Sequence, residues 1–290
     1  MICKISSYKL VEKLNIKFNY NNKKFSIFYC YNCEAAVTYP FLSEANLKHL
    51  YKSGKGQDNS NKKKLNIIMH YLRTFFIEFF YLKKIKKIFP RKNNSVLDFG
   101  CGDGYLGLSL KKSFSKVYFS DFDSSNNNLH SPKNNLFYIP LKKVFIDNKK
   151  FDLIILRHVL EHMPNPKIII HKLSKLLNKN GKILIEVPAF SIDYFWMKVF
   201  KESYFQWQIP FHLFHFSPKS IKILFQKNFR IKFLNYSQYV LAPSVNRFFF
   251  NKQSKSLDNP LLWILLTPLE IIYNFFIKQN NCALFALKKK

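Results

Sequence analysis

The 290-residue sequence has few acidic residues, few arginines and few glycines. Asp and Glu together number 17 against 47 Lys and Arg, which gives a formal net charge of +30. A surplus of this size attracts polyanions such as nucleic acid, anionic membranes or phosphorylated substrates. Only five of the basic residues are Arg, however, and proteins that read nucleic acid favour Arg for its bidentate contacts. Because Lys, Asn, Ile and Phe are all abundant, we attribute most of the charge to compositional bias and predict no specific nucleic-acid partner.

Neither the cysteines nor the hydrophobic segments indicate a secreted or membrane-spanning protein. Five cysteines do not form an extracellular disulfide pattern, and the polar, mixed N-terminus does not resemble a secretory signal. The most apolar run, residues 259–277, is close to the ~20 residues of a membrane span but contains Pro268, Glu270 and Asn274. We expect this run to form one or two helices that pack on the fold or lie on a membrane surface. The expected location is cytoplasmic, with peripheral membrane contact as an option.

Four of the seven glycines lie within residues 100–107, directly after a short apolar run, Val96–Phe99. Gly100, Gly102 and Gly104 alternate with other residues, and an apolar helical pattern follows them. The pattern predicts a strand, a tight turn and a helix, in which glycine lets a ligand approach the main chain. The start of such a helix offers free N–H groups. The G-x-G-x-G spacing differs from the G-x-G-x-x-G of dinucleotide-binding folds.

Two acidic residues complete this pattern. Asp98 precedes the glycine loop, and Asp121 follows a second apolar strand, Lys116–Ser120. Asp121 lies 21 residues after Gly100, close to the spacing at which an acid in a βαβ unit meets ribose hydroxyls. The combination indicates a nucleotide-type cofactor site rather than two acids in ordinary loops.

The stretches V-L-D-F-G-C-G-D-G (96–104) and V-Y-F-S-D-F-D (117–123) resemble the first two motifs of the class I S-adenosylmethionine-dependent methyltransferases. A third matching stretch, at 151–166, reads F-D-L-I-I-L-R-H-V-L-E-H-M-P-N-P. The resemblance implies a Rossmann-like α/β fold, with a seven-stranded, mostly parallel sheet, an antiparallel last strand and flanking helices. It also implies S-adenosyl-L-methionine as the cofactor and methyl transfer as the reaction.

The resemblance places the cofactor at the glycine loop and at the ends of neighbouring strands. Asp121 stands in the ribose-binding place, and Asp98 would fix the loop or meet the ammonium group through water. The expected cofactor-binding residues are Asp98, Phe99, Gly100, Cys101, Gly102, Gly104, Asp121, Phe122, Arg157 and His158. An acid that often follows the third strand and contacts the adenine amine is replaced here by Pro140, Leu141 and Lys142.

The apolar patterns predict the remaining elements. We expect helices at 65–89, 166–177 and 218–227, and strands at 136–139, 151–156, 182–187, 229–234 and 282–287. Ser217 and Pro218 suit the N-cap and N1 positions of the last helix. The methyltransferase domain is expected over residues 61–290, with a helical insertion at 238–280.

His158, Glu161 and His162 are spaced i, i+3 and i+4, which places them on one face if the segment is helical. Two interpretations are open. One is a divalent-metal site, because some quinone O-methyltransferases that carry Glu-x-x-Glu-His at this place bind a divalent cation. The other is that the Glu-His pair positions the cofactor loop, which we favour, so we predict no bound metal.

Residues 204–217 combine many aromatic residues with two histidines, as an active-site lid would. Histidine is the natural general base for a hydroxyl near neutral pH. His212 matches the histidine of the family's H-x-x-x-F-S segment, so we predict it as the base and His215 as the second candidate; packing or capping roles are the alternative. Similar sugar C-methyltransferases have Tyr and Glu where Ile209 and Phe211 stand here, which favours oxygen as the acceptor atom.

Residues 1–60 are expected to form a small module of short strands and turns. Cys30 and Cys33 form a C-x-x-C pair that supplies two of the four ligands of a structural zinc site, and Cys3 is a possible third. The segment resembles the second half of a zinc module found in several bacterial methyltransferases, without its first cysteine pair. We interpret it as a degenerate zinc knuckle and leave zinc binding open.

We therefore predict an S-adenosylmethionine-dependent methyltransferase that O-methylates a sugar, a glycan or a related small molecule. The half-preserved N-terminal module favours a sugar-type acceptor. The apolar runs favour an alternative, a lipid or quinone precursor at the membrane surface. A non-catalytic basic binding protein with a degenerate cofactor fold is the third option.

Overall fold

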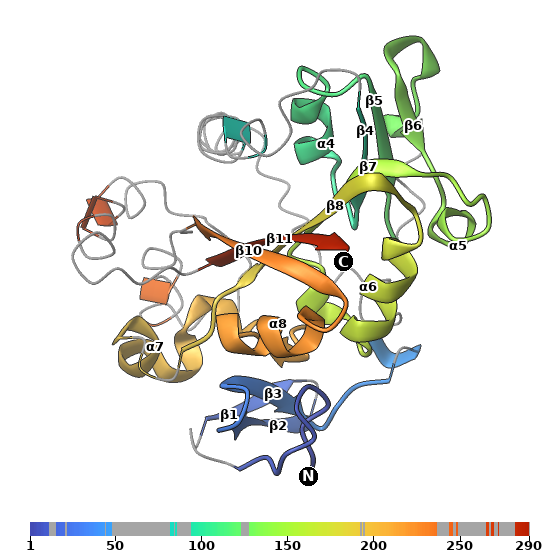
Figure 1. Cartoon of the computed structure of the whole chain (residues 1–290). Coiled ribbons are helices and arrows are strands. Elements are labelled where there is room, and N and C mark those ends of the chain that lie inside the picture. Colours follow the sequence, from blue (N-terminus) through green and yellow to red (C-terminus); the bar gives the residue numbers. More distant parts are fainter. Residues whose placement is uncertain are drawn as a thin grey trace. The chain divides into compact units, whose positions relative to one another are not determined.

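The computed structural model describes the chain in two compact units, each made of several segments (Figure 1). The first unit contains Met1–Asn61, Glu161–Pro166 and Val187–Leu284, and the second contains Lys62–Leu160, Lys167–Glu186 and Phe285–Lys290. The described residues are 1–11, 16–20, 22–43, 45–47, 82–83, 85, 94–122, 128–191, 193, 195–236, 244–245, 248, 265–266, 268–269, 272 and 282–289.

The second unit is built on five parallel strands in the order β8-β7-β4-β5-β6. They are β4 (Ser95–Phe99), β5 (Lys116–Ser120), β6 (Leu136–Tyr138), β7 (Phe151–Arg157) and β8 (Leu177–Pro188). Strands of a parallel sheet are covered on both faces, so they read as continuous apolar runs. Val96 and Leu97 on β4 and Leu153–Leu156 on β7 are accordingly fully buried. The predicted α/β class and parallel sheet are confirmed.

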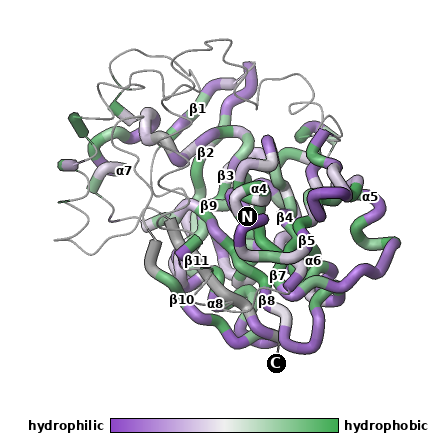
Figure 2. Tube along the Cα trace, turned by 90° about the horizontal axis from the view of Figure 1, so that it is seen from above, coloured by the Kyte–Doolittle hydropathy of each residue, from purple (hydrophilic) through white to green (hydrophobic). Residues whose placement is uncertain are grey.

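Two further strands, β10 (Phe229–Tyr236) and β11 (Cys282–Lys289), extend the hydrogen-bonded order to β10-β11-β8-β7-β4-β5-β6. The last strand of the sequence, β11, therefore lies between β8 and β10. The α-helices between the strands of this sheet are α4 (Tyr105–Leu110), α5 (Leu141–Val144) and α6 (Pro166–Ser174). Two 3₁₀ turns also lie between them, η3 (Pro132–Asn134) and η4 (Leu160–His162). Hydrophobic residues concentrate along the central strands in Figure 2, and hydrophilic ones along outer segments such as α5.

Helix α6 ends earlier, and strand β8 begins earlier, than the sequence predicts. The helix stops at Ser174 rather than 177, and the strand starts at Leu177 rather than 182. Leu177 pairs with Phe151, and an irregularity in the register follows before Leu153 pairs with Lys182. Gly181 sits in this irregular stretch, where a Cβ atom would lie 2.9 Å from the Phe151 carbonyl oxygen.

The first unit contains an antiparallel sheet that joins distant parts of the chain. Its order is β1-β2-β3-β9, with β1 at Lys17–Tyr20, β2 at Lys23–Cys30, β3 at Ala35–Tyr39 and β9 at Phe214–His215. Ala36 pairs with His215 and Val37 with Phe214, so the predicted lid segment forms the edge of the N-terminal sheet. Three short helical segments precede β9, namely α7 (Phe195–Phe200), η5 (Lys201–Ser203) and η6 (Phe205–Trp207).

A buried aromatic cluster joins Tyr29 of β2 to residues that follow β8 in the sequence, namely Phe190, Phe200, Tyr204 and Trp207. Helix α8 (Pro218–Phe225) begins at its predicted cap, since the Ser217 hydroxyl accepts a hydrogen bond from the Ser220 N–H. The many aromatic residues of 204–217 therefore form part of a core.

Several predicted segments fall largely outside the described residues. These are the helix at 65–89, the domain boundary near residue 60 and the insertion at 238–280. Within the apolar run at 259–277, the five described residues are helical. None of the helices in the described part of the chain combines the length and the apolar character needed to cross a bilayer.

Candidate cofactor site

The glycine loop follows β4 and exposes bare backbone at one position. Gly100, Gly102 and Gly104 have φ angles of 77°, 55° and 75°, in the left-handed region that side chains disfavour. A Cβ atom on Gly100 would lie 2.4 Å from Val159 Cγ2, and one on Gly104 would lie 2.4 Å from Leu129 Cδ1. A Cβ atom on Gly102 would meet nothing within 4 Å. The first and third glycines therefore permit close packing, whereas Gly102 presents its main chain to open space.

Asp121 lies beside this open backbone. Its Oδ2 accepts a hydrogen bond from the Gly102 N–H at 2.7 Å. The N–H groups of Gly100 and Cys101 both donate to the Ser120 carbonyl oxygen, at 2.7 and 3.1 Å. The end of β5 and the loop after β4 are thus tied together, as the spacing of Gly100 and Asp121 predicts.

Asp98 supports the loop from inside the protein. Its side chain is 2% exposed, and its Oδ2 accepts a hydrogen bond from the Gly107 N–H in the first turn of α4 at 3.0 Å. Burial raises the pKa of Asp98 to about 7, although the Gly107 N–H and the Arg157 charge act in the opposite direction. The geometry supports the first of its two expected roles, which is to fix the loop.

The neighbouring loop residues differ in exposure. Phe99 and Cys101 are buried, and Phe122 is exposed. Burial raises the pKa of the Cys101 thiol well above its usual range, so this side chain stays neutral. Phe99 and Cys101 therefore shape the loop by packing.

Arg157 and His158 both turn toward the next strand. Arg157 Nε lies 3.1 Å from Oε2 of Glu186, and His158 Nε2 lies 3.1 Å from its Oε1. Burial raises the pKa of Glu186, but the Arg157 charge and the His158 contact outweigh burial and lower the pKa overall. The two expected cofactor residues thus link the end of β7 to β8 through Glu186. The next residue after His158 is Val159, whose side chain leaves no room for a Cβ atom at Gly100.

The expectation that His158, Glu161 and His162 share one face is wrong. His158 has a φ of 53°, which breaks the helical path before residues 160–162 form a 3₁₀ turn. Glu161 and His162 instead meet His212: Glu161 Oε1 lies 4.0 Å from His212 Nε2, and the two imidazole rings are 4.7 Å apart. The ligand-type atoms of Glu161, His162 and His212 lie within 4.8 Å of one another. That no metal binds here stays a prediction.

Backbone carbonyl groups fix the tautomers of His162 and His212. His162 Nδ1 lies 3.0 Å from the Phe211 carbonyl oxygen, and His212 Nδ1 lies 2.7 Å from that of Gln206. Because a carbonyl oxygen only accepts, each Nδ1 carries a hydrogen and each Nε2 is the basic nitrogen. The basic nitrogen of His212 therefore faces Glu161 in a buried site.

His215 is a weak base in its buried position. The Thr38 hydroxyl donates to the His212 carbonyl oxygen at 2.6 Å, so His215 Nε2, at 3.1 Å, must donate to Thr38 Oγ1. Burial lowers the pKa of His215 to about 3. A base acts best when its pKa is near the working pH, so His215 accepts a proton poorly at neutral pH.

The comparison with known families agrees with this geometry. The sequence model of a family described as a methyltransferase domain matches residues 70–229, more than half of the chain. The chain belongs to this methyltransferase family.

Curated relatives of this methyltransferase match it over shorter stretches. The ubiquinone biosynthesis O-methyltransferase of Pelagibacter ubique (strain HTCC1062) is 31% identical over 125 residues, which cover 41% of this chain and 51% of that protein. The tRNA U34 carboxymethyltransferase of Aliarcobacter butzleri (strain RM4018) is 32% identical over 118 residues, or 38% of each protein. The chain spans about half the length of the ubiquinone-type relatives and a smaller share of the tRNA U34 carboxymethyltransferase.

Solved structures that resemble the methyltransferase include the plantazolicin methyltransferase BpumL, determined in complex with a monoazolic desmethylPZN analog and SAH. It aligns with a TM-score of 0.49 and 14% identity, over 85% of this chain and 97% of that one. The MccD protein aligns with a TM-score of 0.47 and 15% identity, over 73% and 97%.

S-adenosyl-L-methionine is the cofactor of this family, and the loop of this methyltransferase fits it. The open space at Gly102 admits a ligand against the main chain, and Asp121 offers a carboxylate at the same place. After β6, Pro140 is the N-cap of α5 and Lys142 lies in its last turn, so the usual adenine acid is absent from this stretch.

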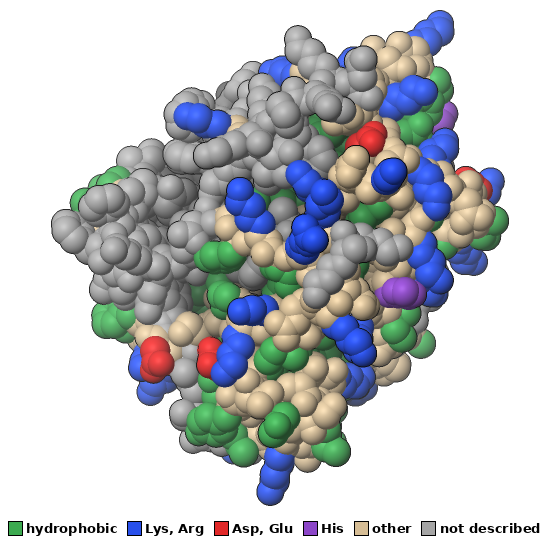
Figure 3. Space-filling view, viewed as in Figure 1, with side chains coloured by type: hydrophobic (Ala, Val, Ile, Leu, Met, Phe, Trp, Pro, Cys, Tyr) green, Lys and Arg blue, Asp and Glu red, His purple; other side chains and the backbone are tan. Residues whose placement is uncertain are grey.

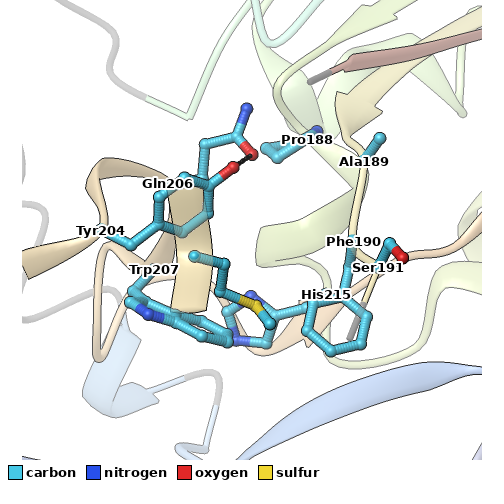
Figure 4. Close-up of a pocket in the computed structure, with 9 residues that line it drawn as sticks. Pro188, Ala189, Phe190, Ser191, Tyr204, Gln206, Trp207 and His215 are labelled. Carbon is cyan, nitrogen blue, oxygen red and sulfur yellow. Dashed lines mark hydrogen bonds between the residues drawn. The ribbon is translucent and has the colours of Figure 1, made fainter. Parts of the chain in front are cut away.

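A pocket in the first unit contains His215 together with side chains that the sequence did not single out (Figure 4). Trp207 and His215 meet edge to face with ring centroids 4.8 Å apart, and the Tyr204 hydroxyl donates to Gln206 Oε1 at 2.7 Å. Phe190 and Met197 also line the pocket. The aromatic density of 204–217 was the one sequence signal for this pocket.

The Asp98→Asn variant should lose a pH dependence of stability. Because the native pKa of about 7 exceeds the ordinary value of 3.8, the native state holds a proton that the unfolded chain releases. This contribution is full at low pH and is lost as the pH rises through 7, by roughly 4 kcal/mol in total.

Wild type should lose more thermal stability between pH 5 and 8 than Asp98→Asn. Circular dichroism melts test this, with the exposed Asp147→Asn as control; equal slopes for wild type and Asp98→Asn would contradict it.

Proposed function

We propose that this chain is an S-adenosylmethionine-dependent methyltransferase that methylates an oxygen atom of a small-molecule acceptor. The hydrogen bond of 2.7 Å between Asp121 and the Gly102 N–H, beside open backbone, carries this proposal. It holds a carboxylate where a ribose would be recognised, at the carboxyl end of a parallel sheet. Ligands of open α/β sheets bind at this edge.

The candidate residues of the two units have distinct tasks in the proposed reaction. Bound S-adenosylmethionine supplies a methyl group that its positively charged sulfur has already activated. Asp121 accepts hydrogen bonds from the ribose, and Asp98 holds the loop against α4. His212 accepts the hydroxyl proton of the acceptor at Nε2, and the Glu161 carboxylate stabilises the resulting imidazolium. His215 remains the second candidate for this role.

The acceptor class is a proposal that rests on the N-terminal module and on the relatives. The three clustered cysteines of that module resemble part of the zinc module of sugar-methylating enzymes, so a sugar or glycan is our first proposal. A quinone precursor is the second. The curated O-methyltransferases of ubiquinone biosynthesis support this second candidate.

The surface charge is compatible with acidic acceptors or with peripheral contact to an anionic membrane. Lys and Arg side chains are spread over the face seen in Figure 3, where Asp and Glu side chains are few. Among the described residues on that face they do not gather in one patch, which is in keeping with compositional bias as the main cause of the charge.

The Asp121→Ala variant should bind the cofactor at least tenfold more weakly than wild type, because charge-assisted hydrogen bonds to the ribose are lost. Isothermal titration with S-adenosylmethionine and with its demethylated product measures this. Asp193→Ala is the matched control, since Asp193 is exposed and pairs only with Lys198 among the ion pairs of the described residues. Unchanged affinity in Asp121→Ala would remove Asp121 from the site.

A second measurement distinguishes the acceptors. Methyl transfer from labelled cofactor should occur to hydroxyl groups of sugar-type or phenolic compounds, and a panel of both decides between them. Failure of folded wild type to bind either cofactor form would favour the non-catalytic alternative.

A further inference from the structure

Three cysteine thiols and one hydroxyl converge at the N-terminal sheet. Cys3 Sγ lies 3.6 Å from Cys33 Sγ, and Ser6 Oγ lies 3.1 Å from Cys30 Sγ. The three sulfur atoms lie within 4.8 Å of one another, and the three cysteines are at most 1% exposed. Zinc bound tetrahedrally with bonds of 2.3 Å separates two sulfur ligands by about 3.8 Å. The spacing of Cys3 and Cys33 is close to that value.

The two chain segments that carry these groups have the same backbone form. In Cys30–Glu34, the Glu34 N–H donates to the Cys30 carbonyl oxygen at 2.8 Å, and Glu34 has a φ of 57°. In Cys3–Ser7, the Ser7 N–H donates to the Cys3 carbonyl oxygen at 2.9 Å, and Ser7 has a φ of 62°. Each segment is therefore a knuckle whose first and fourth residues point inward together. Ser6 holds in the first knuckle the place that Cys33 holds in the second.

We propose that Cys3, Cys30 and Cys33 bind a zinc ion and that the Ser6 hydroxyl occupies the fourth position. Three thiolates select a thiophilic ion such as zinc over calcium or magnesium, which prefer oxygen ligands. The module has three cysteines instead of four because its first knuckle carries a Cys-x-x-Ser pair, Cys3 and Ser6, in place of a second C-x-x-C pair. The module is then altered rather than incomplete.

The cluster is joined to the segment that carries the candidate base. The Ser217 hydroxyl donates to the Cys33 carbonyl oxygen at 2.9 Å while it caps helix α8. Two residues further along, β3 begins, and its pairing with β9 places Ala36 opposite His215. An ion that fixes the second knuckle would therefore also stabilise β9 and the start of α8.

The first test measures metal in the full chain purified with a reductant. We expect one zinc per chain by elemental analysis, and a melting temperature that falls when a chelator removes the ion. After exchange with Co²⁺, the spectrum should show tetrahedral ligand-field bands and sulfur-to-cobalt charge transfer. A chain that takes up neither ion, and whose melting temperature a chelator leaves unchanged, would overturn the proposal.

Variants at the fourth position make the test specific. Ser6→Cys should bind zinc at least tenfold more tightly and add intensity to the charge-transfer band, because a fourth thiolate joins the ion. Ser6→Ala should retain that band at the wild-type intensity but bind zinc more weakly. Ser115→Ala, which changes an exposed serine in the second unit, is the control with unchanged zinc binding. Equal zinc affinity of wild type, Ser6→Cys and Ser6→Ala would exclude Ser6 as a ligand. A Cys3–Cys33 disulfide in the reduced preparation, seen by mass spectrometry without zinc uptake, would also refute the site.

Discussion

The Gly107→Val variant is expected to unfold at a much lower temperature than wild type. Gly107 lies on α4 against β5, and a Cβ atom there would lie 2.2 Å from Cε1 of the fully buried Phe119. Valine adds two further carbon atoms at a position where the ring cannot move aside. Overpacking typically costs 1–3 kcal/mol, and we expect about 3 kcal/mol here. The gain in helix propensity over glycine is only a few tenths of a kcal/mol. Thermal and urea unfolding measure the loss.

Gly102→Ala is the matched control and should show the opposite pattern. Its Cβ atom would meet nothing within 4 Å, so the fold loses only the cost of a φ of 55°, about 1 kcal/mol. The added methyl group would nevertheless occupy the open space in which the cofactor approaches the main chain. We therefore expect near-normal melting and a loss of cofactor affinity. A Gly102→Ala chain that binds S-adenosylmethionine as wild type does would place the cofactor elsewhere.

The cofactor loop could be predicted because the residues that determine its conformation are close together in the sequence. Strand β4, the three glycines and α4 follow one another within residues 95–110, and backbone angles alone require glycine there. Asp121 was found by its spacing, which two parallel strands and one connecting helix impose. These parts of the site depend little on how the rest of the chain packs.

The surroundings of the histidines could not be predicted because they depend on distant pairing. Helical spacing suggested that His158 lies with Glu161, but the positive φ of His158 turns its side chain to Glu186. Glu161 meets His212, 51 positions later, and no periodic pattern joins them. Thr38 and His215 are 177 positions apart in the sequence and touch only because β3 pairs with β9.

Replacing Glu186 should cause the largest loss of stability among the charged residues of the second unit. Glu186 is fully buried and holds Arg157 and His158 through its two oxygen atoms. In Glu186→Ala, the Arg157 guanidinium, whose side chain is 15% exposed, keeps its charge and loses its buried partner. Removing one partner of a buried pair typically costs about 3–5 kcal/mol. Chemical unfolding of wild type and variant near neutral pH measures this cost.

The cause of that loss can be separated from the loss of packing by a double variant. If the unpaired Arg157 charge is responsible, Arg157→Leu combined with Glu186→Leu should recover most of the stability, since a hydrophobic pair of similar volume often replaces a buried ion pair at no cost. Asp193→Ala, which breaks the exposed pair with Lys198, should cost less than about 1 kcal/mol. Because the pKa of Glu186 is lowered in the native state, its contribution should be present at neutral pH and disappear as the pH falls through that pKa. A double variant as unstable as Glu186→Ala would show that the strand ends need the charged pair itself, and not only the absence of an unpaired charge.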